Sequence, residues 1–224
     1  MKDYYSEKLS ARRLKRCYEI APPRVRQYLE AEIDHVLQKL CPKDIVLELG
    51  CGYGRVLLPL SRKALWVIGV DTSFHSLQLA KGMLHDVSNV HLLAMNAVKL
   101  AFSNHIFDMV VCIQNGISAF NVNQRDLIQE SIRGTKIGGT VLFSSYSDKF
   151  WKHRLEWFKL QSEEGLLGEI DHEKTCDGVI VCKDGFTAIT VSSNQFIELT
   201  KGFNVETRIV EIDESSLFCE LTVI

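Results

Sequence analysis

The stretch VLELGCGYGRV at residues 46–56 decides which fold this sequence adopts. An apolar run ends around the acidic Glu48, and glycines at positions 50, 52 and 54 then alternate with other residues before a helical pattern starts. Glycine permits a positive φ and carries no Cβ, so the backbone of such a loop can press against a ligand. The N-terminus of the following helix offers free N–H groups to an anion. We therefore interpret the stretch as a ligand-binding loop, with a purely structural tight turn as the alternative.

The nicotinamide-dinucleotide fingerprint is the nearest rival interpretation of this loop. It requires glycine at the first, third and sixth positions, the last of them to let helix and strand pack closely. Arg55 stands at the sixth position, and Glu48 just before the loop would repel a pyrophosphate. Both residues argue against a dinucleotide oxidoreductase.

Short apolar runs alternate with helical patterns around this loop. The predicted strands, which we expect to be buried on both faces, are residues 45–49, 65–70, 90–94, 107–113 and 140–143. The helical patterns between them cover residues 54–61, 73–84 and 124–133. This alternation predicts an α/β fold with a doubly wound, mostly parallel sheet. A short helix ending at Gly202, followed by strands at 204–212 and 217–223, predicts a C-terminal antiparallel hairpin that completes a seven-stranded sheet.

Two segments lie outside this alternating core. Residues 4–19 and 23–40 are predicted helices separated by two prolines, and they form an N-terminal helical cap. An antiparallel β insertion follows strand five, with a helix at 151–160 and a meander of strands at 170–175, 179–183 and 186–191. We expect a single domain over residues 1–224, divided into the cap 1–40, a cofactor-binding core 41–146 and 193–224, and a substrate lid 147–192.

A second acidic residue, Asp71, ends the predicted strand that follows the glycine loop. A carboxylate there can accept hydrogen bonds from both hydroxyls of a ribose, and a helix N-cap is the alternative role. Taken together, residues 45–71 resemble the first two motifs of the class I, Rossmann-like methyltransferases that depend on S-adenosylmethionine (SAM). The resemblance implies SAM as the cofactor, with its methionine carboxylate at the glycine loop and its ribose at Asp71.

The resemblance extends over residues 40–146 and 193–224. Asn96 occupies the place where the family contacts the adenine amine, and although an aspartate is commoner there, an amide oxygen can accept the same hydrogen bond. The segment 107–116 resembles the motif that ends at the methyl-transfer site, and 136–142 resembles the glycine turn into strand five. The cofactor-binding residues implied in this way are Glu48, Gly50, Cys51, Gly52, Gly54, Asp71, Thr72, Asn96, Ala97, Ile113 and Gln114, with Tyr18 from the cap. For Tyr18, packing in the core is the alternative.

The implied activity is transfer of a methyl group from SAM to a nitrogen or oxygen of a small-molecule acceptor, with release of S-adenosylhomocysteine (SAH). Positioning and exclusion of water suffice when the acceptor is a neutral amine or an ionised oxygen. Gln114 and Asn115 are the candidate catalytic residues, as positioning groups, and completion of a loop is their alternative role. DNA amino-methyltransferases typically carry Asn or Asp, two prolines and an aromatic residue at this place, and that signature is absent.

The composition and charge of the sequence indicate which kinds of substrate and which cellular location are favoured. The 224 residues carry a formal net charge of -2 with dispersed basic residues, which disfavours a nucleic-acid substrate. Seven cysteines without a CxxC pair or a secretory leader indicate reduced thiols and a cytoplasmic location. The apolar runs are too short to cross a membrane. A methyltransferase acting on RNA or protein and a SAM-binding protein without catalysis remain alternatives, and the oligomeric state stays open.

Two further groups of residues, one of His and Cys and one of basic residues, are not expected to have a functional role. His172, Cys176 and Cys182 do not follow a common zinc-ligand spacing, so no metal site is expected. His153, with Lys152 and Arg154, is interpreted as part of a solvated helix face, and a role toward a substrate anion or as a base is the alternative.

Overall fold

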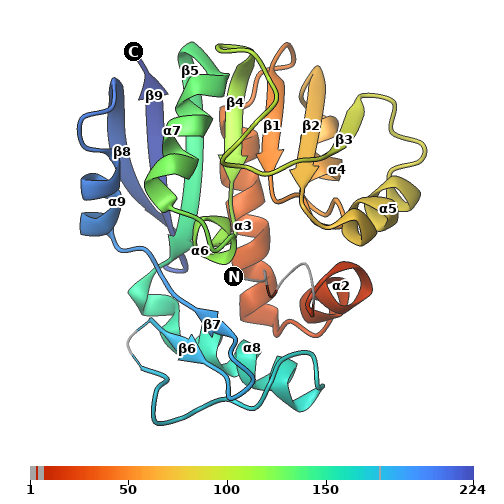
Figure 1. Ribbon diagram of the computed structural model, residues 1–224, viewed down its shortest axis with the longest axis vertical. Coiled ribbons are helices and arrows are strands. Elements are labelled where there is room, and N and C mark those ends of the chain that lie inside the picture. The colour runs from red at the N-terminus through yellow and green to blue at the C-terminus, as the bar shows by residue number, and fades with distance from the viewer. Residues whose placement is uncertain (1–3, 5–7, 177) are drawn as a thin grey trace.

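The computed structural model describes residue 4, residues 8–176 and residues 178–224. Its main sheet contains seven strands in the order β3-β2-β1-β4-β5-β9-β8 (Figure 1). These strands are β1 (Ile45–Leu49), β2 (Trp66–Asp71), β3 (Val90–Ala94), β4 (Phe107–Cys112), β5 (Thr135–Tyr146), β8 (Val205–Ile212) and β9 (Ser216–Val223). The first five pair in parallel, and β9 pairs antiparallel with both β5 and β8. The predicted doubly wound sheet with its C-terminal antiparallel hairpin is confirmed.

Helices cover both faces of this sheet. They are α2 (Ala11–Glu19), α3 (Pro23–Lys39), α4 (Leu57–Ser61), α5 (Phe74–Met83), α6 (Gly116–Ala119), α7 (Gln124–Gly134), α8 (Trp151–Glu163) and α9 (Ser193–Thr200), with a 3-10 turn η1 (Asp148–Phe150). On one face, apolar side chains of α3, α4 and α5 pack against Val46, Val67 and Val111. On the other, α6, α7 and α9 pack against Leu47 and Val110. In Figure 1, α7 crosses the front of the sheet while α3 lies behind it.

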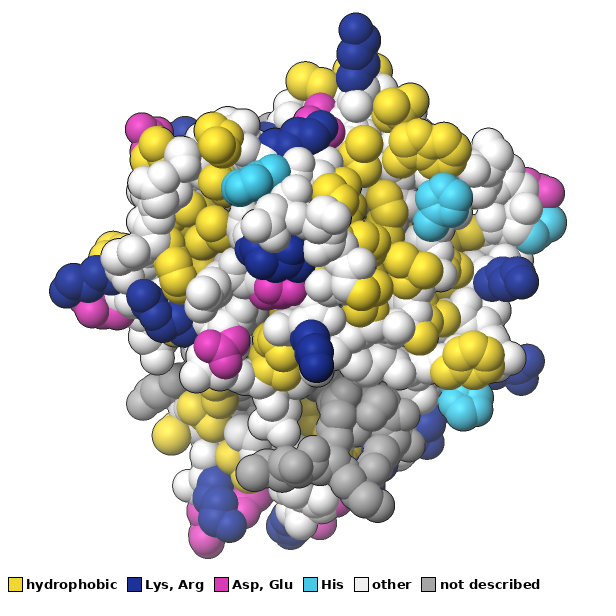
Figure 2. All heavy atoms as spheres, turned by 45° about the horizontal axis from the view of Figure 1, so that its top comes forward, with side chains coloured by type: hydrophobic (Ala, Val, Ile, Leu, Met, Phe, Trp, Pro, Cys, Tyr) yellow, Lys and Arg dark blue, Asp and Glu magenta, His cyan; other side chains and the backbone are white. Residues whose placement is uncertain are grey.

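The expectation that every core strand is buried on both faces is wrong for β3. Its residues are exposed or half-buried because β3 is the edge of the sheet, where a strand has a neighbour on one side only. No helix follows β3, so Trp66 and Leu93 on the adjoining surface stay 40% and 38% exposed. Hydrophobic side chains gather accordingly on the right of Figure 2.

Several predicted boundaries differ from the structure. The predicted helix 4–19 is interrupted at residues 8–10, after which α2 starts at Ala11, while residues 5–7 lie outside the described residues. Strand β5 begins at Thr135 instead of after a glycine turn, and Gly138, at φ 77°, lies within it next to a register shift against β4. The predicted meander is reduced to two short strands, β6 (Ile180–Val181) and β7 (Thr187–Ala188), with two isolated bridges.

The cap and the insertion form one packed unit below the sheet. Cys17, Val25 and Tyr28 of the cap share an apolar cluster with Trp157 and Phe158 of α8, to which Phe186 also belongs. The indole Nε1 of Trp157 donates a hydrogen bond of 2.9 Å to the carbonyl oxygen of Cys17. Figure 1 shows α8, β6 and β7 beside the ends of α2 and α3. Neither segment therefore has a core of its own.

Arg154 corrects the interpretation of residues 152–154 as a solvated helix face. Its side chain is fully buried, with the guanidinium 4.4 Å from the centroid of the Tyr146 ring. It donates hydrogen bonds to the carbonyl oxygens of Gly178 and Ala188. Arg154 thus ties α8 to the β6–β7 hairpin, while Lys152 alone of this run is exposed.

In the part of the chain that the structure describes, no helix is both long and apolar enough to cross a membrane.

Candidate functional site

A cavity of about 420 Å³ opens at the carboxyl ends of β1, β2 and β4. It lies beside the point where the strand order reverses, since β2 and β3 extend to one side of β1 while β4 and β5 extend to the other. The crevice at such a switch point is the usual ligand site of open α/β sheets. The glycine loop, α2, the segments after β2, β3 and β4, and α8 all contribute to its wall. Of the predicted cofactor-binding residues, Glu48, Gly50, Cys51, Gly52, Asp71, Thr72, Asn96, Ala97, Ile113, Gln114 and Tyr18 line this cavity.

Asp71 fastens the glycine loop to the end of β2. One carboxylate oxygen accepts a hydrogen bond of 2.8 Å from the N–H of Gly52, and the other accepts one of 2.7 Å from the N–H of Ser73. Ser73 itself is the N-cap of α5, so the alternative role of Asp71 as that N-cap is not what the structure has. A carboxylate oxygen has two lone pairs and can accept more than one hydrogen bond.

Gly54 is placed differently from the other two glycines of the loop. It does not line the cavity, and its φ of 89° is a conformation that a residue with a side chain rarely adopts. A Cβ at this position would lie 2.9 Å from the Cδ1 atom of Leu84 and 3.2 Å from the Cβ of Ala80. The structure therefore assigns Gly54 to close packing of the loop against α5, not to ligand contact.

Glu48 brings a buried carboxylate to the cavity wall. Glu48 is 4% exposed, and its Oε2 atom has no hydrogen-bond partner among the described residues. Burial raises the pKa of this carboxyl to about 8, against a smaller lowering by Arg55. A buried acid without a partner is costly for the protein alone. Such an atom at a cavity is suited to a cationic ligand group.

Gln114 and Asn115 follow β4 in the left-handed region, at φ 59° and 61°. The N–H of Gln114 donates to the Glu32 carboxylate at 2.6 Å and to the Ser144 hydroxyl at 2.7 Å. Its side chain lines the cavity, where its Nε2 atom has no partner among the described residues.

The side chain of Asn115 points away from the cavity, toward β5 and the insertion. It accepts a hydrogen bond from the Ser145 hydroxyl and donates one to the carbonyl oxygen of Ile189, and it is not part of the cavity wall. Of the two candidate catalytic residues, the structure thus brings only Gln114 to the cavity. Asn115 joins β4 to the insertion, which is the loop-completing role that we weighed as its alternative.

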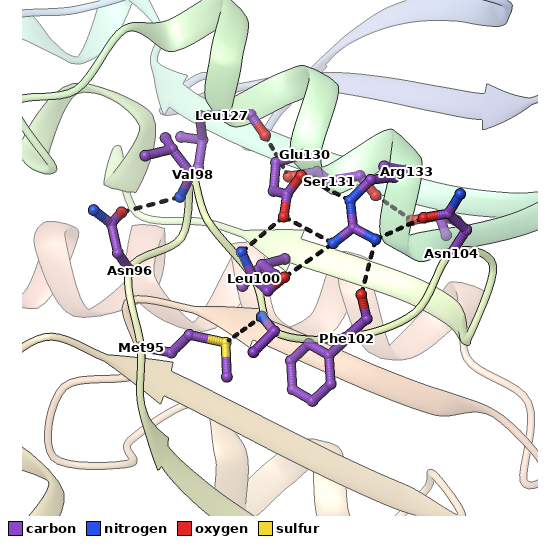
Figure 3. Close-up of polar contacts among 12 residues, drawn as sticks. Met95, Asn96, Val98, Leu100, Phe102, Asn104, Leu127, Glu130, Ser131 and Arg133 are labelled. Carbon is purple, nitrogen blue, oxygen red and sulfur yellow. Dashed lines mark hydrogen bonds and ion pairs between the residues drawn. The ribbon is translucent and has the colours of Figure 1, made fainter.

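The segment after β3 is held by a single ion pair of α7 (Figure 3). The Arg133 guanidinium binds the Glu130 carboxylate at 2.8 Å and donates to the carbonyl oxygens of Leu100 and Phe102. Glu130 in turn accepts a hydrogen bond from the N–H of Leu100. This network fixes the loop on which Asn96 and Ala97 stand. Asn96 is exposed, and its Oδ1 accepts a hydrogen bond of 3.0 Å from the N–H of Val98.

Aromatic side chains surround the end of the cavity that faces the cap and the insertion. Tyr18 of α2 lies edge-on to Tyr53 and 5.9 Å from the ring of Trp157. The other members of this aromatic end are Tyr146, Phe158 and Phe186. Burial raises the pKa of both Tyr18 and Tyr146, so their hydroxyls stay neutral at physiological pH.

Sequence reasoning missed Glu32, Arg55 as a cavity residue, and the aromatic end. Glu32 had a signal: it stands four residues after Tyr28 and four before Val36, within the apolar face of α3. An acid at that position has to find partners inside the protein. Nothing in the sequence indicated that Trp157 would reach the cavity. Among the described residues, no group of three His, Cys, Asp or Glu side chains is arranged to hold a metal ion.

Comparison with known proteins agrees with this geometry. Residues 46–139 match the family model of a methyltransferase domain. The PH0226 protein of Pyrococcus horikoshii OT3 has a similar structure, with a TM-score of 0.68, 20% identity and complete coverage of both chains. The N-methyltransferase NodS of Bradyrhizobium japonicum WM9, solved with SAH, has a TM-score of 0.65 at 14% identity, over 98% of each chain. A SAM-dependent methyltransferase of Methanosarcina mazei has a TM-score of 0.61 at 19% identity, over 84% of this chain and 97% of its own. The comparison with curated proteins found no match.

Residues 46–139 match a methyltransferase domain, and the chain has the fold of solved SAM-dependent methyltransferases. Both findings support SAM as the cofactor.

Proposed function

We propose that this methyltransferase acts on a small molecule, transferring the methyl group of SAM to a nitrogen or an oxygen. The observation that carries the proposal is the aromatic end of the cavity, which the cap and the insertion cover jointly. An acceptor bound there is enclosed by side chains, as small-molecule ligands usually are. On the face shown in Figure 2, Lys and Arg side chains are dispersed, so no continuous basic surface suits a phosphate backbone.

The residues of the cavity fit SAM. The partnerless Oε2 atom of Glu48 matches a cationic group, and the methionine ammonium is the natural candidate. Asp71 is proposed to bind the ribose hydroxyls through its carboxylate, and Asn96, with Ala97 beside it, the adenine amine. The backbone of Gly50, Cys51 and Gly52 would lie along the methionine part, with Thr72, Ile113, Gln114 and Tyr18 completing the wall. When bound, SAM supplies a methyl group that its sulfonium makes electrophilic.

The protein provides positioning more than acid–base chemistry at the acceptor end. Among the described residues of the aromatic end, Tyr18, Tyr53 and Tyr146 carry titratable hydroxyls, and burial raises the pKa of all three, so they stay protonated. The acceptor therefore has to arrive as a neutral amine or an already ionised oxygen. Gln114 would orient it through the amide, and the aromatic side chains would exclude water.

We also propose the domain division as a functional one. Residues 41–146 and 193–224 would hold the cofactor, and residues 147–192 together with the cap 1–40 would act as the lid over the acceptor. The hydrogen bond from Trp157 to Cys17 and the shared apolar cluster support a lid built from both segments.

Radiolabelled SAM tests the acceptor class. A cell extract is separated into small molecules, RNA and protein, and each fraction is incubated with the enzyme and methyl-labelled SAM. We expect label in the small-molecule fraction, and about ten- to a few hundredfold slower labelling when Asp71→Ala replaces the enzyme at a SAM concentration below saturation. Label confined to RNA or protein would overturn the small-molecule proposal. SAM binding without transfer to any fraction would favour a non-catalytic SAM-binding protein.

A further inference from the structure

The cap and the insertion contribute no charged side chain to the cavity wall among the described residues. Most of their side chains there are apolar or aromatic, such as Leu29 and Trp157. The charged residues of the wall, Glu48, Arg55 and Asp71, all come from the core around the glycine loop. A charge buried without a counter-ion is costly. The part of the cavity between cap and insertion is therefore suited to an uncharged ligand.

Gln161 brings a buried amide to this aromatic end of the cavity. It is 3% exposed and belongs to the cavity wall. It stands one helical turn after Trp157 and Phe158, so its side chain leaves α8 on the same buried face as these two rings. Its side-chain amide makes no hydrogen bond with any residue that the structure describes. The amide is thus available to a ligand in the cavity.

The position of this amide among aromatic rings indicates a polar group on the ligand. An amide without a partner in an apolar setting destabilises the protein, whereas an apolar side chain there would not. The amide has an acceptor oxygen and a donating NH2 group, so it can bind an N–H, a hydroxyl or a carbonyl group. Gln114, whose Nε2 atom also has no partner among the described residues, lines the same cavity from the end of β4. Both amides match neutral polar groups.

The rings around Gln161 favour a flat, apolar ligand body. The ring centroids of Trp157 and Phe158 are 5.9 Å apart, and so are those of Phe158 and Phe186. Rings at such distances offer faces and edges to a further aromatic ring. Arg55 approaches this end from the core, with its guanidinium 4.6 Å from the centroid of the Tyr18 ring. A cationic ligand on that ring would be repelled by Arg55.

We infer that the acceptor is an uncharged molecule with a flat, apolar body, and that Gln161 selects it through a hydrogen bond to a neutral polar group. This inference rests on the small-molecule acceptor proposed above. An aromatic amine has these properties, because it is neutral at physiological pH. It also meets the condition that the acceptor needs no base. Gln161 is thereby assigned as a specificity residue for the acceptor.

Four probes that share a naphthalene body test the inference. Near neutral pH, 2-naphthylamine is uncharged, 2-naphthoate is an anion, 2-naphthylmethylamine is a cation, and naphthalene has no polar group. Calorimetric titration measures the binding of each probe to the protein saturated with SAH. Gln161→Leu and Gln161→Glu are compared with wild type, and Gln38→Leu, at an exposed position of α3, is the control. Thermal unfolding and titration with SAH establish that each variant is folded.

We expect wild type to bind 2-naphthylamine at least about tenfold more tightly than either charged probe, since those probes have to bury a charge without a counter-ion. Gln161→Leu should weaken 2-naphthylamine by about three- to tenfold, the effect of losing a neutral hydrogen bond, and should not weaken naphthalene. Gln161→Glu should bind the cationic probe more tightly than wild type does, because it supplies the counter-ion. Gln38→Leu should match wild type.

Binding of 2-naphthoate more tightly than 2-naphthylamine would assign recognition of the acceptor to Arg55 and overturn the inference. Tighter binding of the cationic probe by wild type would overturn it as well. The same holds for an unchanged affinity for 2-naphthylamine in Gln161→Leu and for a wild type that binds none of the probes. In each of these cases the labelled extract still decides whether the acceptor is a small molecule, because that assay does not depend on the charge of the acceptor.

Discussion

The carboxylate of Glu32 in α3 accepts a hydrogen bond of 2.6 Å from the backbone N–H of Gln114, 82 residues further along the chain. The same carboxylate accepts hydrogen bonds from the hydroxyls of Ser144 on β5 and Ser216 on β9. Because Gln114 adopts a positive φ, its peptide needs such a fixed acceptor to stay in place. Glu32 thus sets the position of the one candidate catalytic residue that reaches the cavity.

Replacing Glu32 should destabilise the protein. In Glu32→Ala the N–H of Gln114 keeps only the Ser144 hydroxyl, and Ser216 loses an acceptor, so we expect a loss of about 1–3 kcal/mol in the free energy of unfolding. Urea unfolding measures it. Glu30→Ala, at an exposed position of the same helix, should stay within about 0.5 kcal/mol of wild type. An equal, small effect of both substitutions would show that the Glu32 contacts contribute little.

The affinity for SAH should depend on pH through Glu48. Its pKa of about 8 means that the carboxyl is mostly protonated at pH 6, whereas pairing with an ammonium requires the ionised form. Binding therefore releases a proton, and affinity should rise between pH 6 and 7.5, by at most about tenfold per pH unit. Calorimetry in buffers of different ionisation enthalpy measures the proton release. The affinity of Glu48→Gln for SAH should not depend on pH in this way, nor should the affinity of wild type for 5′-methylthioadenosine, which lacks the amino-acid end of SAH. A pH dependence that persists in Glu48→Gln assigns the proton to another group.

The stability of the ligand-free protein should follow the opposite trend. A folded-state pKa raised from 4.5 to about 8 means that the folded protein holds the Glu48 proton more tightly than the unfolded chain. Its contribution to the unfolding free energy therefore falls as pH rises from about 4.5 to 8 and is constant above that. Glu32, with a pKa raised by burial to about 7, acts in the same direction. Glu48→Gln should gain stability over wild type, and thermal unfolding should show this gain increasing from pH 5 to pH 8.5. A pH-independent difference would mean that Glu48 is not the group that titrates.

Asp71 should matter for the cofactor more than for the fold. We expect Asp71→Ala to weaken SAM by about ten- to a few hundredfold, through lost hydrogen bonds to the ribose and looser attachment of the loop at Gly52. Asp71→Asn should be milder, because an amide oxygen still accepts one hydrogen bond. Calorimetric titration of the folded variants measures both. Wild-type affinity in Asp71→Ala would show that the ribose lies elsewhere.

The network in Figure 3 should control the order of the segment after β3. Arg133→Ala removes the donors to the Leu100 and Phe102 carbonyl oxygens, so we expect faster hydrogen exchange at Val98 and Leu100 and weaker binding of SAH. The loss should amount to about 1–3 kcal/mol in the free energy of local opening. Arg208→Ala, at an exposed position of β8, serves as control. Unchanged exchange in Arg133→Ala would mean that the loop is held by its apolar contacts alone.

The sequence by itself determined the parallel α/β core around the glycine loop and the positions of Glu48 and Asp71 near the ends of two strands. Both acids end strands within 23 residues of each other, and parallel pairing of β1 with β2 brings strand ends to one edge of the sheet. These are local patterns joined by one short crossover. Periodicity of apolar residues and the positions of glycine therefore suffice to predict them.

Only the tertiary structure decided which residues surround the aromatic end of the cavity and which contacts hold them there. The bond from Glu32 to Gln114, the contact of Trp157 with Cys17 and the rotation of Asn115 toward Ile189 all join segments far apart in the chain. The insertion has too few strand residues to fold on its own pattern, so its place is set by the apolar cluster that it shares with the cap. The Arg55 guanidinium lies 4.6 Å from the centroid of the Tyr18 ring, in a helix far from it in the sequence. Such contacts are selected by the packing of the whole chain, which no local pattern of residues encodes.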